Sequence, residues 1–506
     1  MPRYLTPPDL DEATVAAVLA PVGTVVLGPP EPLTATYFDT FDWRLHGAGL
    51  VLVEELGAER RLCFLDGSRE PHLSPATATP TTAGSLPPGY LAERVGPVLG
   101  IRALLPVGAA RVVRRDGRIE DPNGDLLARL RLEQVTVLDG LGAPVGDTRP
   151  TLWTDGDEAA AAVAAAPGVS PVPDNDLEAV TAARGRSPGD YSSKLRIRLD
   201  PTQRADRALR AILLELLGTL EANVEGAVAD HDTEFVHDIR VACRRSRSAL
   251  TQVKGVLEAD VAGPANAELK WLGGVTNPLR DLDVYLLEMP VYRSMLPPAA
   301  AAELAPLETL LRRSRRRAHR SVVRALRSDR FTRFATGWRE VLISDQPSPV
   351  PEAARPVAEV AGERIARAHR RILKHGRGLG DDPPAEALHR LRIDAKKLRY
   401  LLEFFASLYP DDEVGARVKE LKRLQDILGG FNDMHVQSEH LAELAGQLRA
   451  EPAVGAGCLL ALGRLSAALE ARQEGFRLAF HDAFADFASK PVRRAFARLA
   501  GEREEP

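Results

Sequence analysis

Two patterns of hydrophobic and polar residues divide the chain, and the change falls near residue 200. Residues 1–200 hold short apolar runs separated by glycine and proline, a pattern that predicts β-strands. A stretch rich in Pro, Gly and Asp at 167–190 predicts a loop or linker. Two of the strands, joined through Gly57, predict a hairpin. The predicted strands are Thr34–Phe38, Leu50–Val53, Arg61–Leu65, Ala110–Arg114, Leu126–Leu130 and Gln134–Leu138, with short helices at Asp9–Ala20 and Glu158–Ala166.

From about residue 201, apolar residues recur at spacings of three and four, which predicts helices. Prolines mark the predicted breaks, because proline removes a backbone donor; they are Pro264, Pro278, Pro290 and Pro297–Pro298. The stretch 344–356 is the predicted seam between two halves. We expect an α+β chain with a β-domain at 1–195 and an all-helical domain at 201–500, in repeats of about 201–343 and 357–500. The predicted helices are 207–222, 235–256, 300–327, 363–374, 385–408, 413–428 and 436–448.

Composition narrows the class of protein. The 506 residues include 66 Lys+Arg and 70 Asp+Glu, a net charge of −4, but residues 1–200 carry −8 and residues 201–506 carry +4. Only three cysteines occur, without a CxxC pair, which argues against a disulfide scaffold or a cysteine zinc site and favours the cytoplasm. Neither a signal-peptide pattern nor an apolar run of membrane-spanning length is present. Arginine is abundant throughout, so only its placement is informative.

The helical region contains an internal repeat. The segment from His237 to Arg247 matches the segment that begins at His389 and ends at Arg399, with the histidine, an arginine, a basic pair and the last arginine recurring. The two segments are 152 residues apart, a spacing that we call the repeat offset. The same offset relates Lys270 to Lys422 and Asp281 to Asp433. Four of the nine lysines lie at repeated basic positions, which codon bias does not explain.

On a helix, each copy of this segment has two faces. Ile239, Cys243 and Leu250 lie opposite His237 and the arginines, and the second copy divides in the same way. A third helix, at 312–330, adds ten further basic residues with only Asp329 opposing them. The ordinary interpretation is a solvated surface. Recurrence in both halves, with almost no acidic residues at helical spacing, instead favours a groove that binds a polyanion such as a phosphate chain.

Alternatives stay open for several residues. His237 and His389 suit phosphate binding or a capping or packing role equally. Asp281, Asp283 and Asp433 are interpreted as partners that orient arginines or as helix caps, and not as catalysts. We find no convincing metal-ligand spacing and predict no metal site and no catalytic residue in this domain. Nucleic acid is disfavoured, because aromatic residues make up 5% of the chain and none alternates with the basic positions.

These repeated motifs resemble the conserved-histidine α-helical domain, the CHAD family. The resemblance covers about 201–500 and rests on the two histidine segments, on 279–284 and on its weaker counterpart at 432–436. It implies two helical bundles related by pseudo-symmetry, which bind inorganic polyphosphate between them. The binding residues that it implies are His237, Arg240, Arg244, Arg245, Arg247, Lys270, His389, Arg392, Lys396, Lys397, Arg399 and Lys422, joined by Arg316, Arg320 and Arg324 from the third helix.

The N-terminal region is similar to the CYTH, or triphosphate-tunnel, family. The resemblance rests on 37–40, 43–45, Gly49–Leu50, 105–107 with Arg111 and Arg114, and Ser193–Lys194, and it implies an antiparallel β-barrel or tunnel. Members of that family open with a Glu-x-Glu-x-Lys strand that holds a divalent metal. Residues 1–11 contain neither Glu nor Lys, and Glu54 and Glu55 stand where basic residues are expected. Arg111, Arg114, Arg129 and Arg131 either line a residual pocket or are exposed strand residues.

The sequence therefore predicts a cytoplasmic polyphosphate-binding protein, associated with polyphosphate granules and without a cofactor, whose β-domain has lost catalysis. The alternatives are a metal-dependent inorganic triphosphatase of the CYTH type and a nucleic-acid-binding protein. Chain-length preference and oligomeric state do not follow from the sequence.

Overall fold

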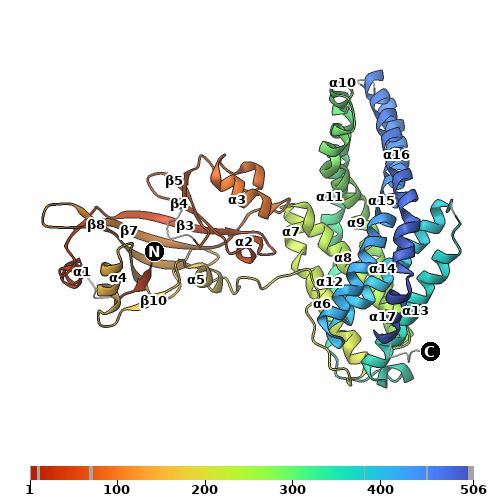
Figure 1. The fold of residues 1–506 in the computed structure, drawn as a ribbon, viewed down its shortest axis with the longest axis horizontal. Helices are drawn as coiled ribbons and strands as arrows, with labels where there is room; N and C mark the ends of the chain where they lie inside the picture. The colour runs from red at the N-terminus through yellow and green to blue at the C-terminus, as the bar shows by residue number, and fades with distance from the viewer. Residues whose placement is uncertain (1, 8–11, 68–71, 381, 452–453, 500–506) are drawn as a thin grey trace. The chain divides into compact units, whose positions relative to one another are not determined.

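The chain folds into two compact units, Met1–Ser193 and Lys194–Pro506. The computed structural model describes residues 2–7, 12–67, 72–380, 382–451 and 454–499. The first unit is built on an antiparallel sheet and the second on helices (Figure 1). This order confirms the predicted fold class. Among the helices described, none is long and apolar enough to cross a membrane.

A ten-stranded sheet runs through the N-terminal unit in the order β10-β1-β9-β8-β7-β3-β4-β5-β6, and β2 pairs with β7. Its strands are β1 (Arg3–Leu5), β2 (Thr24–Leu27), β3 (Glu31–Asp39), β4 (Val51–Leu56), β5 (Arg60–Leu65), β6 (His72–Pro75), β7 (Leu105–Glu120), β8 (Leu126–Leu138), β9 (Arg149–Thr154) and β10 (Ser170–Val172). The helices around it are α1 (Glu12–Leu19), α2 (Arg44–Gly47), η1 (Ala83–Ser85), α3 (Tyr90–Leu99), α4 (Asp157–Ala164) and α5 (Leu177–Ala182).

Most predicted strands are present, and the β4–β5 hairpin is confirmed. Two strands predicted at 126–130 and 134–138 are one strand, β8, because the charged Glu133 between them is buried in an ion pair instead of ending the strand. The stretch 167–190 is not only a loop, since it holds β10 and α5. Val180 of α5 packs on Gly108 of β7, where a Cβ would lie 2.4 Å from the valine. Of the helix predicted at Asp9–Ala20, residues 9–11 lie outside the described residues.

Buried charges of opposite sign lie side by side in the middle of the sheet. Arg114 of β7 donates to both carboxylate oxygens of Glu55 on β4 at 2.8 and 2.5 Å, and to Glu133 of β8 at 2.9 Å. All three side chains are at most 8% exposed. Burial alone would raise the pKa of Glu55, but the hydrogen bonds and charge of Arg114 outweigh it and leave that pKa below its usual value. Of the two acidic residues noted in the sequence, Glu55 is thus the partner of a buried arginine, and Glu54 pairs with Arg60 at 3.3 Å.

The C-terminal unit is helical throughout. Its elements are α6 (Ala205–Ala222), α7 (Val224–Ala229), α8 (Thr233–Gln252), α9 (Ala259–Ser294), α10 (Pro298–Ala302), α11 (Ala305–Leu326), α12 (Asp329–Ile343), η2 (Pro351–Ala354), α13 (Val357–Arg377), α14 (Ala385–Phe404), η3 (Ala406–Leu408), α15 (Asp411–Arg449), α16 (Ala456–Phe487) and α17 (Lys490–Leu499). Their apolar faces meet in shared cores, one of which joins α9, α10 and α11 to α15 and α16.

The repeat offset found in the sequence also relates the helices. It carries both ends of α8 onto the ends of α14, and the first residues of α6 and α9 onto those of α13 and α15. Two backbone hydrogen bonds tie equivalent points together, from Ala205 N to Arg355 O and from Val357 N to Gln203 O, each of 2.9 Å. Because each bond is the other's counterpart under the repeat offset, the two halves are related by an approximate twofold axis at this point.

Two predictions about helix ends are wrong. Pro264, Pro278 and Pro290 do not break the chain, since all three lie inside α9. Burial of one side of α9 along its length, from Ala265 to Tyr292, offsets the hydrogen bonds that proline removes. The helices predicted at 413–428 and 436–448 are one helix, α15, through Gly430. A Cβ there would lie 2.3 Å from the ring of Phe476, so this glycine allows close packing instead of ending the helix.

The buried arginine of the sheet gives a test of the N-terminal unit. Replacing Arg114 by Ala takes the closest cation away from the buried carboxylates of Glu55 and Glu133, whose other basic neighbours, Arg61 and Arg3, lie 3.8 and 3.9 Å away. We therefore expect the free energy of unfolding to fall by about 3–5 kcal/mol. Arg118→Ala on the same strand is the matched control. Arg118 pairs with Glu120, and the Arg118 side chain is 58% exposed. We therefore expect its loss to lower the free energy of unfolding by at most about 1 kcal/mol.

Urea unfolding, followed by hydrogen exchange across β7 and β8, measures both variants. The pH dependence separates the causes further. The lowered pKa of Glu55 means that its pairing stabilises the wild type above the carboxylate's ordinary pKa and is lost as the pH falls. In Arg114→Ala, protonation removes the cost of burying these two negative charges. The loss in free energy of unfolding relative to the wild type therefore becomes smaller toward acid pH. An equal deficit at pH 5 and pH 8 would contradict this account.

Candidate functional site

The repeated histidine segments lie on α8 and α14, and both helices divide into faces as predicted. Ile239 and Cys243 of α8, and Leu391 and Leu398 of α14, are at most 1% exposed. Their burial fixes how each helix is rotated, so the basic positions are left on the outer face. At its start, α8 is capped by Asp232, whose carboxylate accepts a hydrogen bond from Glu234 N at 2.8 Å.

Helices α8 and α14 pack against each other, so the two repeats meet at their basic segments (Figure 1). The Arg244 Nε donates to the hydroxyl of Tyr400 at 2.7 Å, and Arg245 pairs with Glu403 at 2.7 Å. Side chains from both repeats of the helical unit therefore form one surface.

Four cations of this surface, two from each repeat, influence one another's charge. The pKa of Lys396 is lowered to about 8, first because burial removes water from its ammonium group and then because Arg392 and Arg244 lie nearby. The pKa of Arg240 is also lowered by burial and by Arg244. We call Arg240, Arg244, Arg392 and Lys396 the basic cluster.

Two carboxylates hold the outer members of the basic cluster in the same way in each repeat. Arg240 lies 3.5 Å from Asp281, and Arg392 lies 2.9 Å from Asp433. These pairs are equivalent under the repeat offset, and they confirm the interpretation of both aspartates as partners that orient arginines. Asp283 has the same kind of role, at 2.6 Å from Arg315. Four cations with two carboxylates leave an excess of two positive charges.

The two histidines lie on the same helices as the basic cluster. His389 is exposed, and its Nδ1 lies 2.5 Å from Asn432 Oδ1 on α15. This contact fixes the imidazole ring and leaves its Nε2 on the side away from Asn432. His237 occupies the equivalent position on α8 and is half-buried.

Other predicted site residues lie further from the cluster or are engaged elsewhere. Arg399 adjoins Lys396 but pairs with Glu403 at 2.7 Å, and Arg247 donates to Asn266 at 3.3 Å. Lys270 and Lys422 are exposed on α9 and α15. Lys397 lies next to Lys396 in sequence but lines a separate pocket beside α13.

The basic residues predicted on a third helix lie on α11, except Arg327 at its C-cap and Arg330 on α12. Arg316, Arg320 and Arg324 are exposed along one side of α11. Three of the others have acidic partners in distant segments, which the sequence spacing did not reveal. Such pairs join Arg313 to Glu451, Arg315 to Asp230 and Arg330 to Glu268, and within α11 Arg312 pairs with Glu308.

Sequence reasoning missed three residues that shape the site. Tyr400 orients Arg244, and Glu403 pairs with both Arg245 and Arg399. Arg280 lies near Arg240 while pairing with Glu234 at 3.2 Å. Glu403 had a detectable signal, since it lies four residues after Arg399 on a predicted helix. The hydrogen bond from Arg244 to Tyr400 joins residues that are 156 positions apart, so no local sequence pattern indicated it.

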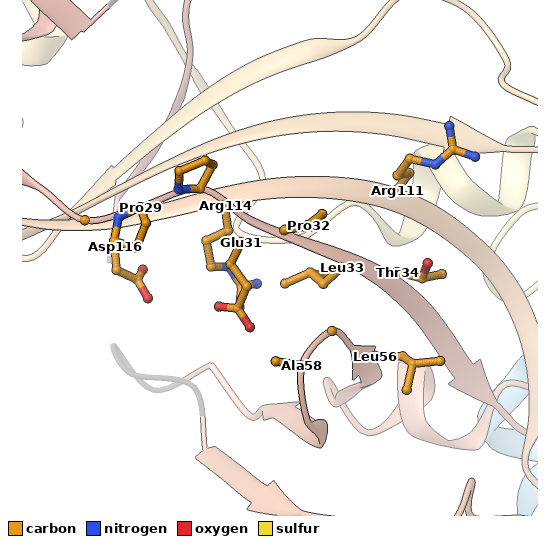
Figure 2. A pocket seen from close by; sticks show the side chains of 13 residues that line it. Pro29, Glu31, Pro32, Leu33, Thr34, Leu56, Ala58, Arg111, Arg114 and Asp116 are labelled. Atoms are coloured by element: carbon orange, nitrogen blue, oxygen red, sulfur yellow. The ribbon is translucent and has the colours of Figure 1, made fainter.

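The N-terminal unit contains a pocket of about 900 Å³ at the β2–β3 turn and the β4–β5 turn. Of the four arginines considered in the sequence, Arg111 and Arg114 line it, whereas Arg131 pairs with Asp116 at 2.6 Å. Figure 2 shows Arg111 at the end of the pocket away from Asp116, with its guanidinium directed away from Glu31. Glu31 and Asp116 also line this pocket, so its charge is mixed.

The carboxylates of this sheet do not form the donor set that a CYTH-type metal site needs. Glu55 and Glu133 are held by Arg114, and Glu31 pairs with Arg61 at 3.1 Å. Within the described ranges, no group of three or more His, Cys, Asp or Glu side chains is placed to hold a metal ion.

Several known proteins are similar to this chain. Two proteins of Mycobacterium tuberculosis, one from each of two strains and both described as uncharacterized, are 26% identical to this chain over 475 residues, covering 86% of it and 87% of theirs. A CHAD domain from the plant Ricinus communis is 27% identical with a TM-score of 0.44, covering 62% of this chain and 98% of its own. PptA from Streptomyces chartreusis is 23% identical with a TM-score of 0.43, covering 56% and 99%.

The family model named CHAD domain matches residues 211–442. This range contains α8, α14 and the whole basic cluster. Residues 211–442 of this chain are a CHAD domain.

Proposed function

We propose that the helical unit binds inorganic polyphosphate at the basic cluster. The observation that carries the proposal is the meeting of four cations, two from each repeat, with only two carboxylates between them. Arginine donates in pairs to phosphate oxygens, and lysine adds a point charge. A flexible chain with a negative charge on every phosphate supplies the counter-charges that the cluster lacks.

The packing of the cluster favours a bare phosphate chain over nucleic acid. Tyr400 is the aromatic residue that contacts the basic cluster, and it does so through its hydroxyl. Its ring is 8% exposed and stacks on Phe404 with ring centroids 6.3 Å apart. A buried ring offers no face on which a base could stack, although single-stranded nucleic-acid binders rely on such faces.

The first test removes charge at the contact between the repeats. In the double variant Arg244→Ala, Lys396→Ala we expect affinity for long-chain polyphosphate to fall by about 10- to 100-fold, because two charge-assisted contacts are lost. The slope of log affinity against log salt should become shallower by about 1.4, at roughly 0.7 per lost phosphate contact.

The matched control is Arg464→Ala, Arg472→Ala, which removes two exposed charges from α16 and should leave affinity within about twofold. Titration of the full chain at two salt concentrations, with RNA as competitor, measures both. Unchanged affinity in a folded Arg244, Lys396 variant would refute the proposal, as would complete displacement of polyphosphate by RNA.

The second test uses pH. With its pKa near 8, Lys396 loses its proton above that pH in the free protein, and a bound polyanion should return the proton. The affinity for polyphosphate should therefore fall by up to about tenfold for each pH unit above 8. The charged groups facing Lys396 are Arg244, Arg392, Arg399 and Asp433.

The conservative variant Lys396→Arg is the control for this effect. Arginine remains protonated throughout the range, so binding by this variant should be nearly independent of pH between 8 and 10. Calorimetry in two buffers of different ionisation enthalpy would also detect proton uptake on binding to the wild type. The same pH dependence in both proteins would show that another group is responsible.

A further inference from the structure

A second concentration of positive charge lies on the helical unit, outside the basic cluster. A pocket of about 230 Å³ is formed by α13, α14 and the end of α8. Five of the nine residues that line it are basic and none is acidic; the basic residues are Lys254, Arg364, Arg367, Arg371 and Lys397.

The carboxylates near this pocket do not balance its charge. Asp394 lies 3.8 Å from both Arg371 and Lys397, and Glu352 lies 3.4 Å from Arg364. Glu363 also interacts electrostatically with Arg364 and Arg367, so three carboxylates face the five cations and leave an excess of two positive charges. This excess is confined to a single small pocket.

One arginine of the pocket is held in place with donor capacity to spare. The Arg364 side chain is 10% exposed, and its Nη2 donates to Lys254 O at 3.2 Å, which ties the end of α8 to α13. Its Nε is buried without a hydrogen-bond partner in the described part of the chain. A buried donor without a partner is costly, and a bound anion would satisfy it.

Comparison of the two repeats shows that this charge is particular to the second. Under the repeat offset, Arg364, Arg367 and Arg371 of α13 correspond to Ile212, Glu215 and Thr219 of α6. Lys397 corresponds to Arg245, which Glu403 neutralises at 2.7 Å. Both repeats share one codon bias, so the general abundance of arginine does not account for the difference.

The pocket is distinct from the basic cluster. None of the four cluster residues lines it. Along α8, Gln252 lies eight residues after Arg244, or about 12 Å at 1.5 Å per residue. Lys397 follows Lys396 on α14 and is therefore turned by about 100° around the helix.

We propose that this pocket is a second anion site, which binds a short, multiply charged phosphate compound through its di- or triphosphate group. Three arginines and two lysines provide paired and single donors for several phosphate oxygens. The pocket is smaller than the 300–1,000 Å³ typical of drug-sized ligands, so the bound part is the phosphate group itself. The site does not depend on polyphosphate binding at the basic cluster.

Titration of the full chain with inorganic diphosphate and triphosphate tests the proposal, with sulfate as the control for non-specific anion binding. We expect one saturable site in the wild type and in the Arg244→Ala, Lys396→Ala variant. In Arg367→Ala, Arg371→Ala the affinity should fall at least tenfold, while long-chain polyphosphate still binds. Ala368→Glu, which adds a carboxylate to the lining without removing any contact, should have the same effect if the double variant fails to fold.

The outcomes separate the two sites. Wild type that binds diphosphate but not long-chain polyphosphate would refute the proposed function and support this inference. Diphosphate binding that is lost in the Arg244, Lys396 variant but kept in both pocket variants would overturn the inference, because the ligand would then occupy the basic cluster. Sulfate that competes equally with diphosphate, or no saturable binding at 0.15 M salt, would also overturn it.

Discussion

Burial of the apolar faces of α8 and α14 is the constraint on which the site depends. Each helix can bury Ile239 or Leu391 and their neighbours in only one rotation, and that rotation leaves the basic positions on the surface that the two repeats share. Burial lowers the pKa of Lys396 most, and the charges of Arg392 and Arg244 lower it further, so the proximity of these cations is unfavourable in itself. The packing energy of two helical bundles holds these like charges together, and only a partner of opposite charge relieves their repulsion.

The two units use arginine in opposite ways. In the sheet, Arg114 is enclosed by Glu55 and Glu133, so its charge is satisfied before any ligand arrives. On the helices, the basic cluster has fewer carboxylates than cations and remains open at the surface. Residue type alone does not distinguish these cases. The number of acidic groups that the fold brings within reach decides whether an arginine supports the structure or is available to an anion.

Much of this arrangement could be read from the sequence, because it depends on local periodicity. The repeat offset, the buried side of α8 and the pairing of Arg240 with Asp281 all follow patterns within one helix or one repeat. Contacts between distant segments could not be predicted. The partners Asp230 of Arg315 and Tyr400 of Arg244 lie 85 and 156 residues away. The helix ends predicted at proline and glycine were wrong for a related reason. Tertiary packing allows α9 to continue past Pro278 and α15 to continue past Gly430.

The paired backbone hydrogen bonds at Ala205 and Val357 join two equivalent halves within a single polypeptide. Two separate copies of such a half would have to find each other, and their joint surface would vanish on dilution. Within one chain, the surface between α8 and α14 exists at any protein concentration. Covalent linkage also frees each half to change alone, so one half can carry Arg367 where the other carries Glu215. A symmetric pair of identical subunits would have to make every such change twice.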